Sequence, residues 1–152
     1  MFTLPLGGGM ENDMKKEWIE VSSYQGEGYL PMIDYETWRV AILRYCEELE
    51  VQNLATMQKH VETDEVFVLL EGNCVLFTGG NETSIGEIAA IAMEPLQLYN
   101  VKKGTWHTHT LDHAATVLIV ENRDTNATNS PTDRLTSAQI EQLQEFYQKV
   151  RG

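Results

Sequence analysis

Short apolar runs cover the middle of the chain, and turn residues separate them at short intervals. Strands are predicted at residues 38–45, 65–70, 74–78, 85–93, 97–101, 105–111 and 115–121. Glycine and asparagine stand between strands, for example at Gly72 and Asn73, where a tight hairpin needs positive φ. Because no long helical period lies between the strands, the pattern favours an all-β antiparallel sandwich or barrel over a parallel α/β sheet.

The one strong helical period comes at the end of the chain. Thr136 is predicted to cap a helix over residues 136–150, with Gln139 as its partner in a capping box. Apolar residues recur along one face of this helix, so we expect it to pack on the outside of the barrel rather than to bind a partner. These residues are Ile140, Leu143, Tyr147 and Val150.

The remaining segments lack strong periodicity. Residues 1–16 include three consecutive glycines, so we expect a mobile lead-in, followed by a barrel domain at 17–134 and the helical region at 135–152. Residues 51–57 have the spacing of one or two helical turns. Residues 122–134 are polar, which predicts a surface loop.

Length and charge narrow the class of protein. At 152 residues the chain is long enough for one domain with one core. Its formal charge of −12 opposes binding to nucleic acid and to anionic membranes. The amino terminus lacks the basic region of a secretory signal, and no stretch approaches the roughly 20 apolar residues of a membrane span. We therefore expect a cytoplasmic protein with Cys46 and Cys74 reduced, a single disulfide being the alternative.

Histidine and carboxylate side chains mark two of the strand regions. His60 stands five positions before Glu65, and His107 and His109 lie two apart on a later strand. Alternate side chains of a strand face the same way, so Gln58 shares a face with His60, and His107 with His109. If the two strands face each other across a barrel, their nitrogen and oxygen atoms suit a divalent metal such as Fe, Mn, Ni or Zn.

These residues, with their spacing, resemble the two motifs of the cupin superfamily over about residues 38–121. His60 matches the second histidine of the first motif, and Glu65 and Gly72 match its glutamate and glycine. Gly104 and His107 keep the spacing of the second motif. The resemblance implies a small, single-domain, jelly-roll β-barrel with a C-terminal helix, and a metal bound in its mouth by His60, Glu65 and His107.

The chain departs from the cupin pattern at several positions. Gln58 replaces the first histidine, and Lys102, Leu111 and Gln52 replace a proline, an asparagine and a glycine. Because a glutamine amide is a weaker ligand than imidazole, we predict His109 as the substitute ligand. His60 and His107 could instead be hydrogen-bonded barrel histidines that hold no metal.

Further side chains are candidates for contact with a substrate. Glu65 is a candidate catalytic residue as well as a ligand, because a carboxylate that opens an apolar strand is costly to bury without a cation. Gln58, Arg39 and Trp106 are candidate substrate contacts. Arg39 could hold a carboxylate bidentately or lie on the surface, and Trp106 could instead belong to the barrel wall.

Two functions follow from the predicted pocket. The first is a metal-dependent isomerase, lyase or dioxygenase that acts on a small polar metabolite. The alternative is a non-catalytic cupin that binds a small ligand as a sensor or store, and a third possibility is a structural oligomer with a relic pocket. The resemblance also implies a homodimer that pairs through edge strands.

Overall fold

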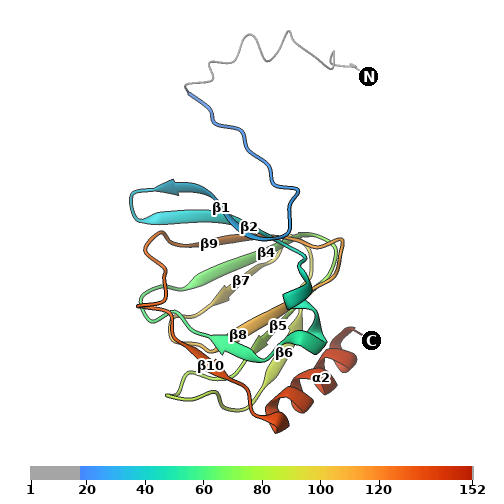
Figure 1. Cartoon of the computed structure of the whole chain (residues 1–152). Coiled ribbons are helices and arrows are strands. Elements are labelled where there is room, and N and C mark those ends of the chain that lie inside the picture. Colours follow the sequence, from blue (N-terminus) through green and yellow to red (C-terminus); the bar gives the residue numbers. More distant parts are fainter. Residues whose placement is uncertain (1–17, 152) are drawn as a thin grey trace.

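The protein folds as two antiparallel sheets packed face to face, with a helix on one of them (Figure 1). The computed structural model describes residues 18–151, so the predicted lead-in at 1–16 lies outside the described residues. Each sheet has five strands, in the order β1-β2-β9-β4-β7 in the first sheet and β10-β3-β8-β5-β6 in the second. The predicted all-β jelly-roll class with a C-terminal helix is confirmed.

The elements have the following bounds. The first sheet contains β1 (Gly28–Tyr35), β2 (Trp38–Arg44), β9 (Thr116–Asn122), β4 (Glu65–Glu71) and β7 (Leu98–Val101). The second contains β10 (Thr132–Arg134), β3 (Thr56–Gln58), β8 (His107–Leu111), β5 (Cys74–Thr78) and β6 (Ala89–Ala92). Two 3₁₀ turns, η1 (Glu47–Leu49) and η2 (Val51–Asn53), precede β3, and α2 (Ser137–Arg151) ends the described chain. The predicted helical turns at 51–57 are therefore confined to η2, and the predicted strand at 85–93 begins only at Ala89.

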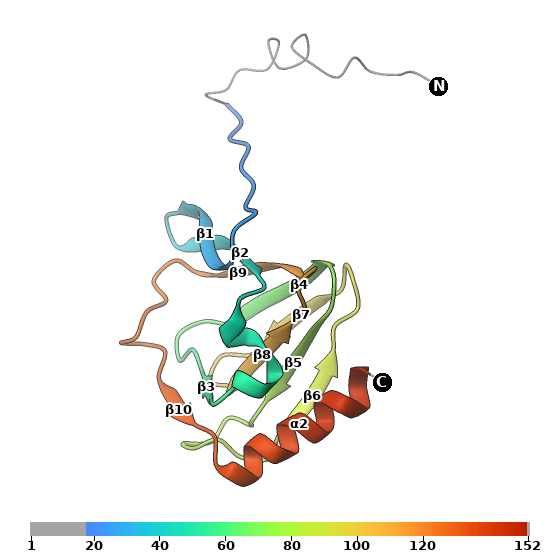
Figure 2. The same cartoon turned by 45° about the vertical axis from the view of Figure 1, so that its right-hand side comes forward.

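Alternation along the strands builds the core between the sheets. Phe67 on β4 and Ile119 on β9 are almost completely buried, and their neighbours in sequence point the other way. A second apolar cluster lies between the second sheet and α2, where Leu143 is fully buried. Figure 2 shows the helix lying along β5 and β6.

Local signals fix the helix start and one hairpin. Thr136 and Gln139 form the predicted capping box: Gln139 N donates to Thr136 Oγ1 at 3.1 Å, and Thr136 N donates to Gln139 Oε1 at 2.9 Å. Gly72 adopts the predicted positive φ, +73°, between β4 and β5. A Cβ atom at this position would lie 2.4 Å from the backbone of Ala115, so the turn also requires glycine for space.

The segment at 122–134 is mostly the exposed loop that its polarity predicts, with two exceptions. Asn129 and Ser130 are buried, and Thr132 begins a short strand that pairs with β3. The Asn129 amide donates to the Asp124 carbonyl at 2.7 Å, and its Oδ1 accepts from Asn126 N at 3.0 Å. Because these polar groups satisfy one another inside the segment, Asn129 can be buried in a loop that is otherwise exposed.

Two predictions made from composition can also be compared with the structure. Cys46 and Cys74 are unpaired thiols, as expected. Among the described residues there is no helix with the length and apolar character of a membrane span.

Candidate metal centre

Each of four strands turns a polar side chain inward at the same end of the barrel. Glu65 opens β4 and His107 opens β8, while Arg39 near the start of β2 pairs in register with Glu121 near the end of β9. Toward the other end of β2, β4 and β9 the inward positions are apolar, as at Phe67, whereas on β8 a second histidine, His109, follows before Leu111. The alternation that builds the core therefore continues into a polar pocket, without a change of strand direction.

His60, Glu65 and His107 meet in this pocket. His60 Nε2 lies 3.3 Å from Glu65 Oε2, and His107 Nε2 lies 3.1 Å from Glu65 Oε1. One ligand atom of each of the three residues lies within 4.8 Å of the others, and all three side chains are buried. Two atoms that are each about 2.1 Å from one ion lie about 3.0–3.4 Å apart at angles between octahedral and tetrahedral, so the observed spacing suits ligands of one metal.

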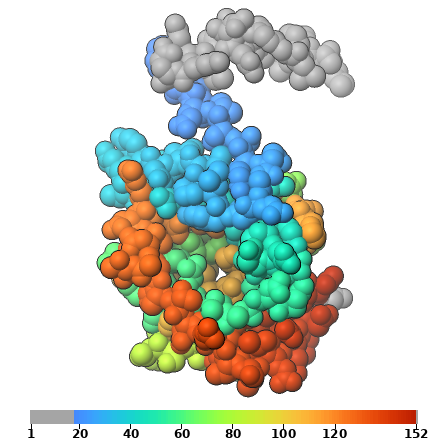
Figure 3. Space-filling model, in the orientation of Figure 1, coloured from blue at the N-terminus to red at the C-terminus, as the bar shows by residue number. Residues whose placement is uncertain are grey.

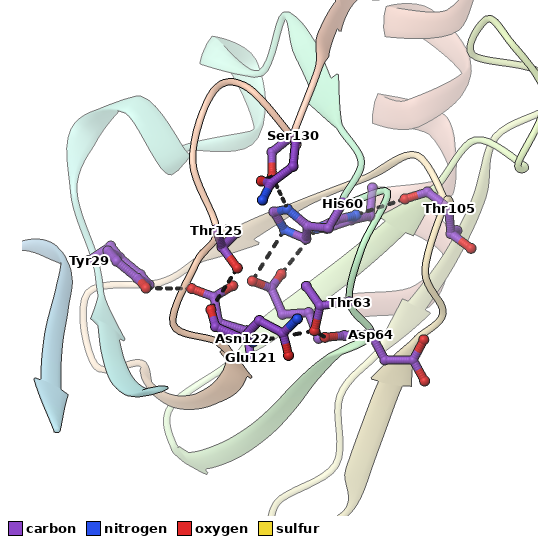
Figure 4. Close-up of polar contacts among 12 residues, drawn as sticks. Tyr29, His60, Thr63, Asp64, Thr105, Glu121, Asn122, Thr125 and Ser130 are labelled. Carbon is purple, nitrogen blue, oxygen red and sulfur yellow. Dashed lines mark hydrogen bonds and ion pairs between the residues drawn. The ribbon is translucent and has the colours of Figure 1, made fainter. Parts of the chain in front are cut away.

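Hydrogen bonds on the far side of each imidazole determine where its proton sits. His107 Nδ1 lies 2.9 Å from the Thr105 carbonyl, which can only accept, so Nδ1 carries the proton. His60 Nδ1 lies 2.7 Å from Ser130 Oγ, and this hydroxyl donates to Asn129 Oδ1, so it accepts from His60 (Figure 4). In the neutral form both Nε2 atoms then direct lone pairs at the Glu65 carboxylate. Among residues 18–151 no group donates a hydrogen bond to His60 Nε2 in this tautomer, and a cation is the group that would complete the arrangement.

Two carboxyl groups with opposite pKa shifts share the pocket. Burial raises the pKa of Glu65, but in the metal-free protein hydrogen bonds donated by His107, His60 and Glu121, with the imidazoles then carrying a proton on Nε2 as well as on Nδ1, outweigh burial and hold this pKa well below its usual value. Burial, with the hydrogen bond and the charge of Glu65, raises the pKa of Glu121 to about 8. At neutral pH Glu65 is therefore ionised and Glu121 carries a proton.

The second carboxyl is held from the opposite side by β1. The Tyr29 hydroxyl donates to Glu121 Oε1 at 2.6 Å (Figure 4). Arg39 lies beside this pair, but its Nε and Nη2 atoms donate to the two oxygens of Asp34 at 2.7 and 3.0 Å. The guanidinium that could have bound a substrate carboxylate bidentately is therefore occupied by a carboxylate of its own hairpin.

A cavity of about 510 Å³ that opens at the surface is lined by Tyr29, Arg39, His60, Glu65 and Glu121, whereas His107 is almost completely buried and does not line it. Figure 3 shows a hollow in the middle of one face, among the strands near the N-terminus in blue, the 3₁₀ turns in teal and the segment after β9 in orange. One part of the wall is apolar, with Leu43, Leu49 and Ile119, and another carries the uncharged polar side chains Gln58, Asn126, Ser130 and Thr132. This volume and lining suit a small polar molecule.

Comparisons with known proteins identify the fold. The sequence matches no protein-family model and no curated protein. Among solved structures, Pac13, a nucleoside dehydratase from Streptomyces, is 14% identical with a TM-score of 0.52, over 75% of this chain and 85% of that chain. CapF, with the inhibitor 3-isopropenyl-tropolone, is 16% identical with a TM-score of 0.50, over 71% of this chain and 32% of that chain. A cupin-2 domain protein from Shewanella frigidimarina is 17% identical with a TM-score of 0.46, over 66% of this chain and 85% of that chain.

The chain shares the β-barrel fold of Pac13, a jelly roll of the kind that the cupin resemblance implied. The resemblance first seen in the spacing of two motifs is thus confirmed for the architecture. Within the cupin barrel the two motifs also touch, because Gly104 N donates to the His60 carbonyl at 2.7 Å. The glycine of the second motif therefore helps to position the histidine of the first.

The structure separates His109 from the other three predicted ligands. It lines the cavity of the cupin barrel, but no atom of it belongs to the group formed by His60, Glu65 and His107. Burial and the nearby His107 lower the pKa of His109 to about 4, against the opposing effect of Glu65, so the ring is neutral. Its Nδ1 atom is buried without a hydrogen-bond partner.

The predicted substrate contacts fall in different places. Gln58 and Arg39 line the cavity. Trp106 is buried in the cluster beneath α2, where its Nε1 donates to the Glu82 carbonyl at 2.9 Å, and it is not among the residues that line the cavity. Of its two alternatives, the structure therefore favours the barrel wall.

Sequence reasoning missed three residues of the site. Glu121 shares the inward parity of Val117 and Ile119, so the alternation could have identified it. Tyr29 lies before the first predicted strand and Ser130 lies in the predicted surface loop at 122–134, and nothing in their local sequence indicated the contacts that they make.

Proposed function

We propose that the protein is a divalent-metal-dependent enzyme that acts on a small polar metabolite, with the metal held by His60, Glu65 and His107. The proposal rests on one observation: two buried imidazoles with protons fixed on Nδ1 direct Nε2 lone pairs toward a buried carboxylate. A buried acceptor without a hydrogen-bond partner, such as neutral His60 Nε2 among the described residues, costs free energy of folding. A bound metal ion would remove this cost by taking the lone pair.

The chain contributes three ligands for a metal ion and one carboxyl group, that of Glu121, that can exchange a proton. A bound divalent metal supplies a Lewis acid that polarises a substrate carbonyl or lowers the pKa of a bound water. Glu65 is a ligand, Ser130 and Thr105 hold the imidazoles in the ligating tautomer, and Glu121 is a carboxyl on the cavity wall that can exchange a proton with a bound molecule. Tyr29 orients the Glu121 carboxyl through its hydroxyl.

This arrangement favours proton-transfer chemistry, that of a lyase or an isomerase, over that of a dioxygenase. A protonated carboxyl beside a metal site can give a proton to a leaving oxygen or an enolate, whereas dioxygenase chemistry has no evident use for it. Because Arg39 is already paired with Asp34, the polar wall offers a substrate hydroxyls, amides and imidazoles instead of a free guanidinium. We therefore infer an uncharged, hydroxyl- or carbonyl-bearing substrate.

Metal analysis of the purified protein tests the proposal. We expect about one equivalent of a first-row divalent metal per chain, measured by elemental analysis after purification without chelator. The double variant His60→Ala, His107→Ala should lose this metal, whereas His113→Ala, an exposed histidine outside the cavity, should keep it. Metal-free wild-type protein that carries an ordered organic molecule in the cavity would instead support the non-catalytic sensor or store.

A further inference from the structure

Most polar side chains on the cavity wall already have hydrogen-bond partners within the protein. Those with a partner among the described residues include Tyr29, Arg39, Thr125, Asn126 and Ser130. The Asn126 amide is typical: its Nδ2 donates to Asp124 at 2.7 Å, and its Oδ1 accepts from Thr128 N at 2.9 Å. A ligand could use such atoms only by breaking a bond that the protein has already formed.

Gln58 and His109 are two exceptions, and both line the cavity from the second sheet. Among residues 18–151 no group forms a hydrogen bond with the Gln58 amide or with the His109 ring. His109 Nδ1 is enclosed by the protein. The Gln58 amide and His109 Nε2 are not among the buried atoms that lack a partner, so they face the open space of the cavity.

The register places both residues next to the proposed ligand His107. Gln58 on β3 pairs directly with His107 on β8, so both side chains point into the barrel. His109 follows two positions along β8 on the same face. Diagonal positions of this kind lie about 7–8 Å apart in an antiparallel pair, a distance that one small ring with its substituents can span. A molecule beside the proposed metal can therefore contact Gln58 and His109 together.

The two side chains offer different hydrogen bonds. The Gln58 carboxamide presents an acceptor and a donor side by side in one plane, which match the neighbouring N–H and C=O of another planar amide. A proton on His109 Nδ1 would have no acceptor among the described residues, whereas a proton on Nε2 faces the cavity, so Nε2 is the donor. On the first sheet Leu43 and Ile119 give the cavity an apolar wall, on which the face of a flat ring can pack.

We propose that the substrate is a cyclic amide or imide that Gln58 and His109 recognise together. Its ring N–H and one carbonyl pair with the Gln58 carboxamide, and a second oxygen accepts a hydrogen bond from His109 Nε2. His109 is then a specificity residue instead of the metal ligand that the sequence suggested. That the bound molecule is a substrate rests on the proposed function, whereas its recognition needs only the two side chains.

Three small rings test this recognition. Glutarimide has both features, N-methylglutarimide has a methyl group in place of the N–H, and 2-piperidone lacks the second oxygen. Each is titrated into the full chain with and without Zn²⁺, and NMR chemical shifts give its dissociation constant. Glutarimide should bind about tenfold or more tightly than either analogue, because each analogue leaves a polar group of the site without a partner.

Two variants assign the hydrogen bonds. Gln58→Leu should bind glutarimide and N-methylglutarimide equally to within about threefold, and His109→Leu should do the same for glutarimide and 2-piperidone. Gln97→Leu replaces an exposed glutamine outside the cavity and should keep both preferences, so it is the matched control. His109→Leu removes a buried atom that has no partner, so the protein should stay folded and keep its metal.

Wild-type protein that binds glutarimide no more tightly than the two analogues would overturn the proposal. Either preference would also do so if it persisted in the variant designed to remove it. Loss of the metal in His109→Leu would overturn it as well, because His109 would then be a ligand. Metal-free wild-type protein with both preferences would refute only the enzyme, whereas metal-containing protein without them would refute only this inference.

Discussion

Replacement of Ser130 by alanine isolates the hydrogen bond that orients His60. The change removes the hydroxyl 2.7 Å from His60 Nδ1 and leaves all three proposed ligands in place. Loss of a hydrogen bond behind a metal-bound histidine typically weakens metal binding 10- to 100-fold, or about 1.4–2.7 kcal/mol. The metal-free variant should lose about 1 kcal/mol of folding stability, the net value of one such bond.

The two effects can be measured separately. Competition with a fluorescent chelator gives the affinity for Zn²⁺ as the probe metal, and urea unfolding of the metal-free protein gives the stability. Ser84→Ala, an exposed serine outside the cavity, is the matched control and should change neither quantity. If Ser130→Ala bound Zn²⁺ within threefold of the wild-type affinity, the tautomer of His60 would not depend on this hydroxyl, and the reasoning for the site would fail.

Three further changes test the electrostatics and the backbone. In the metal-free protein the pKa of Glu121 is raised to about 8. Between about pH 5 and 8 the native state therefore holds one proton more than the unfolded chain. The contribution of Glu121 to the free energy of unfolding thus falls as the pH rises through this range. Glu121→Gln should remove that slope in urea unfolding at pH 5, 6, 7 and 8, and profiles that stay parallel to the wild type would contradict the assignment. Gly72→Ala should cost at least about 2 kcal/mol in urea unfolding, from positive φ and the contact with Ala115, whereas Gly80→Ala, with φ +76° and open space, should show only the backbone strain of about 1 kcal/mol. Thr136→Ala should cost about 1 kcal/mol by the same measurement through loss of the helix cap, and an unchanged midpoint would show that the cap is not needed.

The parts of the structure that were predictable depend on local periodicity. Alternation located β2, β4, β5, β8 and β9 to within a residue or two, and it placed His60, Glu65 and His107 on strands or turns that could meet. The capping box at Thr136 needs only residues three apart, so the start of the helix was also readable.

The contacts that complete the site depend on register between distant segments. Arg39 and Asp34 meet because β1 pairs with β2 through a two-residue turn, and no strand was predicted before residue 38. Ser130 reaches His60 only because β10 pairs with β3. Most of residues 122–134 are exposed, so their polar composition could not reveal that Asn126 and Ser130 line the pocket.

Because the polar side chains lie at one end of four strands, substitutions along a single strand have two different kinds of effect. At Glu65, Glu121 and His107 a substitution alters what the pocket binds, whereas at Phe67, two positions further along β4, it alters whether the sheets hold together. New chemistry can therefore arise at the mouth of this barrel by exchange of a few residues, while the opposite end keeps the scaffold folded. The boundary between the two regions is a single step of the strand pleat, about 7 Å long.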